Sequence, residues 1–464
     1  GATQEMLMRR LRPLAVIAAA LVVVAATYTV RDQPAAGTAP SGTADATADE
    51  AVAALSLPGP RGELAEIDRL IGAYEQRITR HTTPGDYRIL GGLHLERGRL
   101  TGDVTAYIRS ETALNRALQL YPDDLDAQNL LAAVRHHTHD FMGARELAAG
   151  VVARDRGRLD AVALVGDAEL ALGQLDEAAH AYRRLEEALA DSPAVQVRLA
   201  RLAWLRGDVP VATTSAALAL TAARKAGVRG HELAWYRSFA AQLDYDLGDY
   251  TAAERGWRKA LREAPGYHVP TAGLARALAA QGRYDEAIGL YEEAVATLPE
   301  PETVAALGDL YTLTGRQDQA RVQYDTVEVI ATLSEVNRRV FDRQLAFFYV
   351  NHGLHPDRAV TIAEAALRAR PDVYGHDVYA WALHAAGRHH DARAASDRAL
   401  ATGAPDAALH YHAGMISAAL GQHDRARREL AHALELSPEF DPLQASRART
   451  TLAGLDRLQR VGSR

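Results

Sequence analysis

Hydrophobic positions follow two patterns along this chain, and each pattern predicts a different element. Near the start, residues 14–30 read LAVIAAALVVVAATYTV, an uncharged run of 17 residues preceded by three arginines between positions 9 and 12. This length is at the lower end of what a bilayer-spanning helix needs, and the basic flank predicts a cytoplasmic N-terminus. We therefore expect residues 1–30 to form a signal anchor or transmembrane helix. A cleaved signal peptide has the same layout, with residues 24–26 as a weak cleavage site.

A polar segment separates this run from the rest of the chain. Residues 31–60 contain four prolines, three glycines and many Ala, Thr and Asp residues. Such a segment cannot bury enough apolar area to offset the entropy of ordering it. We expect it to be a flexible linker that holds the remaining residues away from the membrane.

The second pattern begins at residue 84, where small and apolar positions recur about every 34 residues. A typical unit has a small residue, a Gly seven positions later and an Ala five positions after that, as in Gly166, Gly173 and Ala178. The first two units are degenerate, with Gly98 and His139 at the Gly position. Five of the nine intervals between the small residues are 34 residues. These small residues are Gly91, Ala132, Gly166, Ala200, Ala241, Ala275, Gly308, Ala346, Ala380 and Gly414.

Each position in the unit has a physical role in a pair of helices. The small residue lets the first helix, helix A, approach the second, helix B. The Gly can adopt a positive φ where helix A ends. An aromatic residue nine positions later, such as Tyr182 or Trp257, fills space between neighbouring pairs, and a Pro such as Pro265 ends helix B. Because one pair cannot bury its own apolar face, the pairs must stack.

This combination of residues resembles the tetratricopeptide repeat, a helix-turn-helix unit of 34 residues. The resemblance implies an all-α solenoid of about ten repeats over residues 84–440, between a capping helix in residues 61–83 and a capping helix and tail in residues 441–464. The sequence departs from the family pattern in two places. Seven extra residues stand between Gly98 and Pro122, and seven more between Gly207 and Gly248.

Composition and charge exclude several classes of function. The 464 residues include 52 basic and 59 acidic residues, for a net charge of −7, which gives no electrostatic case for nucleic acid. The chain has no Cys, so disulfides, thiolate metal sites and Cys nucleophiles are ruled out. Its richness in Ala and Arg indicates a bacterium with a GC-rich genome.

The sequence shows no catalytic motif of the kinds that can be recognised by spacing. It has no phosphate-binding loop, no dinucleotide fingerprint and no Gly-x-Ser-x-Gly elbow, and His231-Glu232 is not followed by the second His of a zinc protease. Paired acids such as Glu186-Glu187 are expected on solvated helix surfaces. We therefore predict a protein that is not an enzyme and needs no cofactor.

Histidine is the one unusual feature of the chemistry. His355, His389 and His423 each follow the turn Gly of their unit by two residues, and positions 136, 137 and 139 form a second group. Equivalent side chains of stacked helices lie roughly 10 Å apart, whereas a metal needs donors at about 2 Å. No metal site is therefore predicted, although a His-rich metal- or ligand-handling envelope protein remains an alternative.

The inner wall of a tetratricopeptide solenoid is built mainly from helix A, and it is the predicted partner-binding groove. Positions −6, −3, +1 and +4 from the small residue share one helical stripe. Charged residues on the same stripe include Asp167, Arg201, Arg276, Asp309 and Arg343. The predicted groove residues are Trp204, Trp235, Tyr245, Phe347, Tyr374, Asp377, Trp381, His384, Tyr411 and Met415.

An aromatic concave stripe is suited to a peptide or amphipathic helix with apolar anchors. We therefore expect a scaffold or assembly factor of a bacterial envelope or membrane complex, with protein partners and no nucleic acid. The repeats are expected outside the cytoplasmic membrane on a single-pass anchor, or secreted after cleavage of a signal peptide. A self-associating structural stalk is a further alternative.

Overall fold

The structure, a computed structural model, describes residues 64–336 and 342–462, which belong to one compact unit. Within these ranges the chain forms 22 helices, α3 to α24, and no strand. The expectation of an all-α solenoid is confirmed for this part of the chain. The predicted membrane segment (residues 1–30) and linker (residues 31–60) lie outside it. In the ranges that are described, no helix has both the length and the apolar character needed to cross a bilayer.

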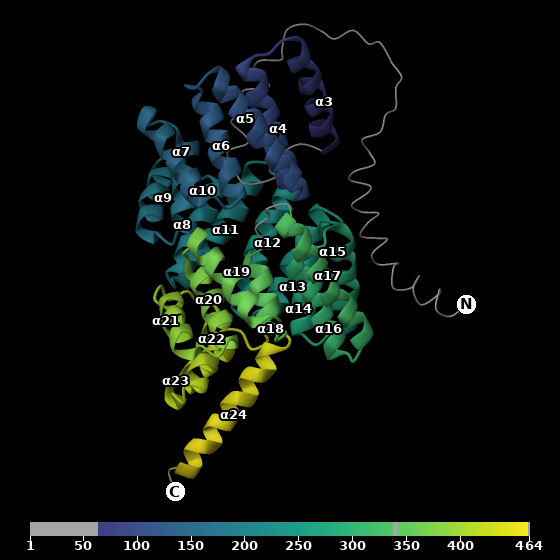
Figure 1. Cartoon of the computed structure of the whole chain (residues 1–464), viewed down its shortest axis with the longest axis vertical. Coiled ribbons are helices and arrows are strands. Elements are labelled where there is room, and N and C mark those ends of the chain that lie inside the picture. The colour runs from purple at the N-terminus through teal and green to yellow at the C-terminus, as the bar shows by residue number, and fades with distance from the viewer. Residues whose placement is uncertain (1–63, 337–341, 463–464) are drawn as a thin grey trace, which may run out of the picture. The chain divides into compact units, whose positions relative to one another are not determined.

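Ten successive helix pairs make up the solenoid, with α3 (Leu64–Arg80) before them and α24 (Gln444–Gly462) after them. Figure 1 shows successive pairs following one another along the chain. The first helices of the pairs, helices A, are α4 (Pro84–Thr101), α6 (Leu125–His137), α8 (Leu159–Ala171), α10 (Pro193–Leu205), α12 (Gly230–Asp246), α14 (His268–Ala280), α16 (Pro301–Leu313), α18 (Asp342–Asn351), α20 (Val373–Ala385) and α22 (Ala407–Ala419). The second helices, helices B, are α5 (Val104–Leu120), α7 (Phe141–Arg154), α9 (Leu175–Leu189), α11 (Val209–Lys225), α13 (Tyr250–Glu263), α15 (Tyr284–Thr297), α17 (Gln317–Val336), α19 (Pro356–Ala369), α21 (His389–Leu400) and α23 (His423–Leu436).

The loop between helix A and helix B has the same backbone conformation in most pairs. The eight glycines predicted to end helix A all have φ between +67° and +78°. His139 takes this place in the second pair with φ +65°. In the first pair the prediction is wrong, because Gly98 lies inside α4 and the left-handed residue is Gly102, with φ +67°. The predicted eight are Gly173, Gly207, Gly248, Gly282, Gly315, Gly353, Gly387 and Gly421.

The small residue of helix A is a close-contact position, as expected. A Cβ added at Gly166 would lie 2.5 Å from the ring of Tyr182, and one at Gly308 would lie 2.5 Å from the ring of Tyr324. Gly98 has the same role, since its added Cβ would meet the Tyr107 ring at 2.8 Å. Any side chain at these positions would force the two helices of the pair apart.

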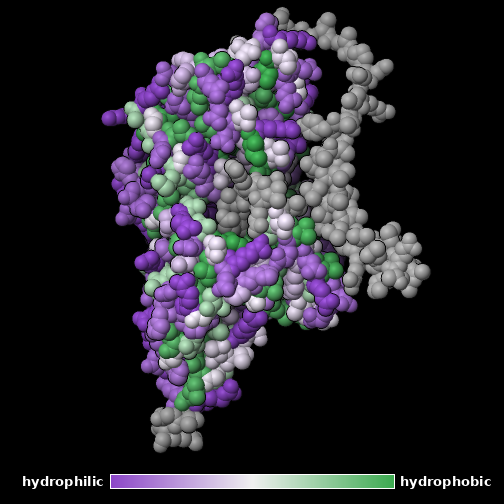
Figure 2. All heavy atoms as spheres, in the orientation of Figure 1, coloured by the Kyte–Doolittle hydropathy of each residue, from purple (hydrophilic) through white to green (hydrophobic). Residues whose placement is uncertain are grey.

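The helices B have one buried apolar face and one exposed polar face. In α13, for example, Ala253, Trp257 and Ala260 are buried, whereas the residues between them are mostly polar and exposed. In the view of Figure 2, hydrophilic residues cover much of the surface and hydrophobic ones appear between them. The seven extra residues between Gly207 and Gly248 lengthen α11 and α12 to 17 residues each and leave the pairing intact.

The solenoid winds tightly enough for later pairs to touch earlier ones. In four pairs, the Gly of the loop between helix A and helix B contacts a residue of a much later pair. That residue follows helix B of the pair that comes five pairs later in the chain. These contacts are Gly102 with Leu298, Gly173 with Pro371, Gly207 with Gly403, and Gly248 with Ser437. One superhelical turn therefore contains five pairs. We call residues 84–267 the first superhelical turn and residues 268–440 the second.

Side chains also join the two superhelical turns. The Tyr250 hydroxyl lies 2.9 Å from the Ser437 hydroxyl and accepts a hydrogen bond of 2.7 Å from the backbone N–H of Glu439. Leu205 of the first superhelical turn shares a core cluster with Val373 and Leu409 of the second. The solenoid is thus closed on itself by apolar packing and hydrogen bonds, and this closure decides which concave side chains are exposed.

Candidate protein-binding cavity

The inside of the first superhelical turn contains a cavity of about 850 Å³. Its walls come from helices A of the first five pairs, from single residues of α3 and α5, from the end of α15, and from the segments around the starts of α14 and α16. Apolar side chains in the wall include Leu100, Leu130, Leu164, Val197 and Val269. The volume is within the range of ligand-binding sites in proteins.

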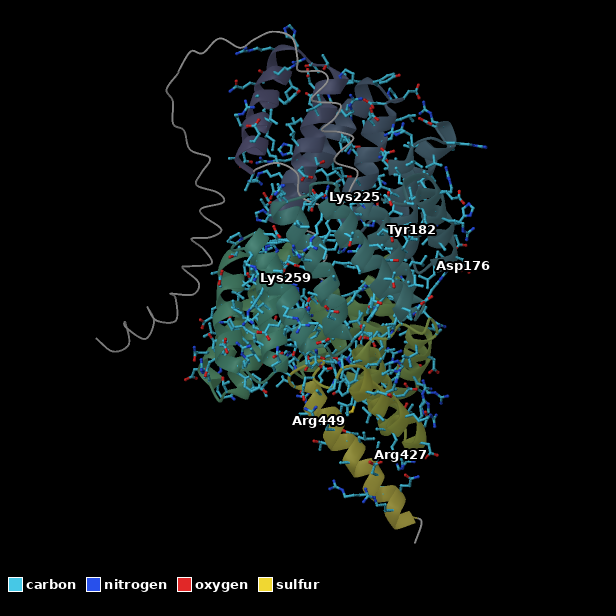
Figure 3. The ribbon with its side chains drawn as sticks, turned by 180° about the vertical axis from the view of Figure 1, so that it is seen from behind. Asp176, Tyr182, Lys225, Lys259, Arg427 and Arg449 are labelled. Atoms are coloured by element: carbon cyan, nitrogen blue, oxygen red, sulfur yellow. The ribbon has the colours of Figure 1, made fainter. Side chains whose placement is uncertain are left out.

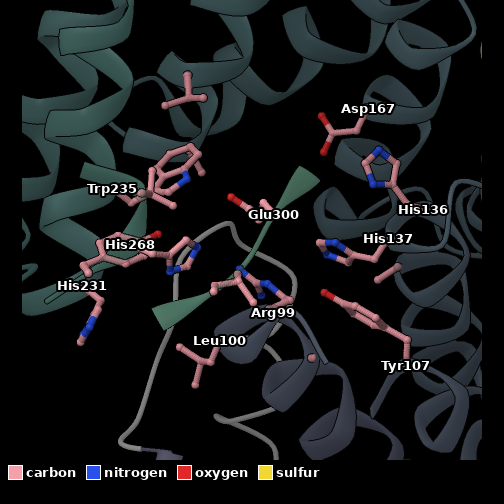
Figure 4. Close-up of a pocket in the computed structure, with 18 of the residues that line it drawn as sticks. Arg99, Leu100, Tyr107, His136, His137, Asp167, His231, Trp235, His268 and Glu300 are labelled. Atoms are coloured by element: carbon pink, nitrogen blue, oxygen red, sulfur yellow. The ribbon is translucent and has the colours of Figure 1, made fainter. Parts of the chain in front are cut away.

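Aromatic and imidazole rings line the cavity on two sides. Figure 4 shows Tyr107, His136 and His137 on one side, and Trp235 and His268 on the other. The His137 ring stacks on Tyr107 with centroids 5.6 Å apart and an angle of 13° between the planes. Burial lowers the pKa of His136, and it lowers that of His137 further, so both rings are neutral at neutral pH.

An ion pair with two hydrogen bonds joins α8 to α10 in the wall. Arg198 donates hydrogen bonds of 2.8 and 2.7 Å to the two carboxylate oxygens of Asp167, and the Tyr182 hydroxyl donates a third of 2.9 Å. Burial by itself would raise the pKa of Asp167, but the charge and hydrogen bonds of Arg198 outweigh it and hold the pKa below its usual value. This carboxylate is therefore ionised and fully engaged.

Arg201 lies one helical turn after Arg198 on the same face of α10 and lines the cavity. Its guanidinium carbon is 5.9 Å from the ring centre of Trp235 and 5.7 Å from that of Phe239. The side chain is exposed to the cavity but surrounded by the solenoid, and burial lowers the pKa of its guanidinium, an effect that Asp167 opposes. Arg201 is thus a cation held over two aromatic rings.

Glu300 is the residue before α16 and also lines the cavity. Burial raises the pKa of its carboxyl group to about 7, and the neighbouring charge of Glu302 adds to the shift. The folded chain therefore binds this proton more tightly than the unfolded chain, for which the usual value is 4.5. Ionisation of Glu300 costs stability as the pH rises from 4.5 through 7.

We predict that Glu300→Gln stabilises the protein at pH 8 and has little effect at pH 4.5. The expected gain at pH 8 is on the order of 1–3 kcal/mol, since one pKa unit corresponds to about 1.4 kcal/mol. Urea unfolding of the wild type and the variant at both pH values measures it. Glu293→Gln, at an exposed position on α15, is the control. An equal effect of Glu300→Gln at the two pH values would contradict the burial of an ionisable carboxyl group.

The helix pairs match sequence models of a known family. Models of the tetratricopeptide repeat match residues 165–228, 244–310 and 407–440. These three stretches of the chain match the tetratricopeptide repeat (TPR).

Solved structures similar to this chain include three proteins. The crystal structure of the APC/C hetero-tetramer Cut9–Hcn1 aligns over 84% of this chain and 93% of that chain, with 15% identity and a TM-score of 0.31. MamA aligns over 37% and 96%, with 17% identity and a TM-score of 0.31. Yeast Tom70 aligns over 89% and 97%, with 13% identity and a TM-score of 0.36. No curated protein matches the chain's sequence.

Half of the predicted groove residues are buried inside the TPR solenoid. Their exposed fractions are between 1% and 7%, so the expectation that they form an open concave wall is corrected at these positions. The physical reason is that neighbouring helix pairs pack over them, and the Tyr245 hydroxyl also lies 3.3 Å from the backbone oxygen of Phe440 after α23. The five are Trp204, Tyr245, Asp377, Trp381 and Tyr411.

Trp381 shows how this burial is satisfied. Its indole N–H donates a hydrogen bond of 2.8 Å to the side-chain oxygen of Asn351. Its ring stacks on His412, with centroids 4.3 Å apart, and on His384, with centroids 4.9 Å apart. His412 in turn has Nδ1 2.9 Å from both carboxylate oxygens of Asp377. These groups bind one another and leave little surface for a partner.

The other predicted groove residues are partly exposed, and they lie in different places. Phe347 and Met415 pack against the core of the second superhelical turn, and Tyr374 packs in the cluster that joins the two superhelical turns. Of all ten, only Trp235 lines the first-turn cavity. The charged positions Asp167 and Arg201, which the stripe also predicted, do line it.

The histidines of the alternative metal hypothesis do not form a cluster. His389 and His423 each begin a helix B, and His355 immediately precedes one. Nε2 of His355 lies 3.6 Å from a carboxylate oxygen of Glu328. Across the described ranges, no group of three or more His, Asp or Glu residues has an arrangement that could hold a metal ion.

Proposed function

We propose that this protein is a non-enzymatic scaffold or assembly factor that binds a polypeptide segment inside its first superhelical turn. The observation that carries the proposal is the cavity of about 850 Å³ lined by helices A of the TPR units. The cavity combines apolar side chains with a few polar groups that can orient a ligand.

The size of the cavity favours a short segment. A helix with its side chains is about 10–12 Å in diameter. A volume of about 850 Å³ therefore holds less than about two helical turns. Burial of apolar side chains would stabilise the complex by about 25 cal/mol per Å², before the costs of association.

We further propose that the scaffold acts at a bacterial envelope or membrane. The support is the uncharged run of residues 14–30 with its basic N-terminal flank. Fractionation of cells that produce the full chain should place it with the membranes, and added protease should degrade the repeats only once the outer surface of the membrane is accessible. Recovery of the chain in the cytosol would contradict this part of the proposal.

Trp235→Ala is the direct test of the cavity as the partner site. The immobilised full chain is used to capture envelope proteins, and a captured partner is purified and titrated against wild type and variant. We expect binding at least about tenfold weaker, because central aromatic residues typically contribute the most to binding. Leu218→Ala is the control, since Leu218 is 49% exposed on α11 and does not line the cavity. Unchanged binding by Trp235→Ala, with preserved helicity, would contradict the assignment.

A further inference from the structure

Five charged side chains line the cavity, and three of them already have a partner. Arg198 and Asp167 bind each other through two hydrogen bonds. Arg99 lies 3.2 Å from a carboxylate oxygen of Glu96. The other two, Arg201 and Glu300, form no ion pair with any residue that the structure describes.

Arg201 is placed to receive an anion. The faces of Trp235 and Phe239, which stack on each other with centroids 6.0 Å apart, lie within 6 Å of its guanidinium carbon. Aromatic contact stabilises the cation without occupying its N–H donors, which remain available for a carboxylate. Asp167 is the carboxylate whose charge acts on Arg201, but its two oxygens are bound to Arg198. A carboxylate that pairs with Arg201 is therefore expected from a ligand.

Glu300 is placed to receive a cation. It precedes α16 but makes no side-chain hydrogen bond to that helix. Its neighbours do not neutralise it, since Glu302 has the same charge and Tyr267 is a neutral phenol. Glu300 is partly buried in the cavity wall without a cation, and such a carboxyl group favours a ligand that supplies one.

We propose that the cavity binds a peptide segment that carries both an acidic and a basic side chain, the acid at Arg201 and the base at Glu300. This inference rests on the proposed function and adds the chemistry of the ligand. Apolar residues of the segment contact the Leu and Val side chains of the wall. A purely acidic segment leaves Glu300 without a partner, and a purely basic one leaves Arg201 without a partner.

Selection from a displayed library of random 12-residue peptides tests the inference on the full chain. We expect the selected sequences to be enriched in those that contain both an acid and a Lys or Arg. One selected peptide is then synthesised in three forms: unchanged, with its acid replaced by the amide, and with its basic residue replaced by Gln. Isothermal titration measures all three against the wild type, Arg201→Gln and Glu300→Gln.

The expected result is a pair of specific couplings. Loss of the peptide acid should weaken binding to the wild type by about tenfold and leave binding to Arg201→Gln nearly unchanged, since close charge pairs couple by about 1.5 kcal/mol or more. Loss of the peptide base should behave in the same way with Glu300→Gln. Arg206→Gln, whose ion pair with Asp176 lies outside the cavity, should show neither coupling.

Two other outcomes are informative. Peptides that bind with Trp235-dependent affinity but show no coupling to Arg201 or Glu300 would overturn this inference and leave the proposed function standing. A selection that yields no peptide dependent on Trp235 would count against the proposed function and the inference together.

Discussion

Arg198→Ala should lower the free energy of unfolding by about 3 kcal/mol, because it leaves the Asp167 carboxylate, which is only 22% exposed, without its cation. The Arg198 side chain is only 7% exposed, and it holds Asp167 through two hydrogen bonds. Urea unfolding at pH 7 with a helical signal measures the loss.

Two controls separate this interaction from the loss of any arginine. Arg206→Ala removes an ion pair with Asp176, whose carboxylate is 95% exposed and points away from the solenoid in Figure 3. It should cost no more than about 1 kcal/mol. The double variant Asp167→Asn with Arg198→Met removes both charges and should recover most of the loss.

The pH dependence of Arg198→Ala follows from the direction of the Asp167 shift. The pKa of Asp167 is lowered in the folded chain, so its contribution to stability is present above the unfolded pKa of about 3.9. That contribution is lost as the pH falls through the lower, folded pKa. Wild type and variant should therefore differ less in strong acid than at pH 7. A constant difference would contradict the ion pair.

Gly207→Ala should destabilise the protein by about 3 kcal/mol, for two separate reasons. Gly207 has φ +76°, where an L side chain costs about 1 kcal/mol or more. Its added Cβ would also lie 2.5 Å from the backbone oxygen of Gly403 in the second superhelical turn. Forcing such a contact apart typically costs about 1–3 kcal/mol.

Gly282→Ala isolates the first reason, the cost of a positive φ. Gly282 occupies the same loop position with φ +75°, but no atom lies within 4 Å of its added Cβ. It should cost only about 1 kcal/mol. The difference between the two variants in urea unfolding measures the contact between superhelical turns. Equal losses would show that the pair formed by α10 and α11 does not touch Gly403.

The local structure of the solenoid is visible in the sequence because each repeat encodes it. The spacing of Gly173, Gly207 and their equivalents predicted where helix A ends, since positive φ is required there. The prediction failed at Gly98 because Gly102, four residues later, is the glycine with positive φ that ends helix A. Gly98 is instead a close-contact position inside α4, because the Tyr107 ring packs where a side chain at position 98 would lie.

The winding of the solenoid is not visible in the sequence, because a small rotation between neighbouring pairs accumulates over five of them. It brings the backbone after α23 against Tyr245, which the helical stripe alone placed on an open wall, whereas neighbouring pairs bury Trp381. Arg201 was on the predicted stripe, whereas Glu300 was missed because it precedes α16 and has no helix-A register. The Pro on each side of Glu300 marks the segment that enters the cavity wall, but it gives no sign of burial.

The most direct test of the account replaces Val269 by a photo-crosslinking phenylalanine derivative in the full chain. Val269 is 38% exposed and lines the cavity, and Leu218 is 49% exposed outside it. We predict that a peptide selected by the full chain crosslinks from position 269 and not from position 218. Crosslinks from position 218 alone would show that polypeptides bind the outer surface and that the inside of the first superhelical turn is not the binding site.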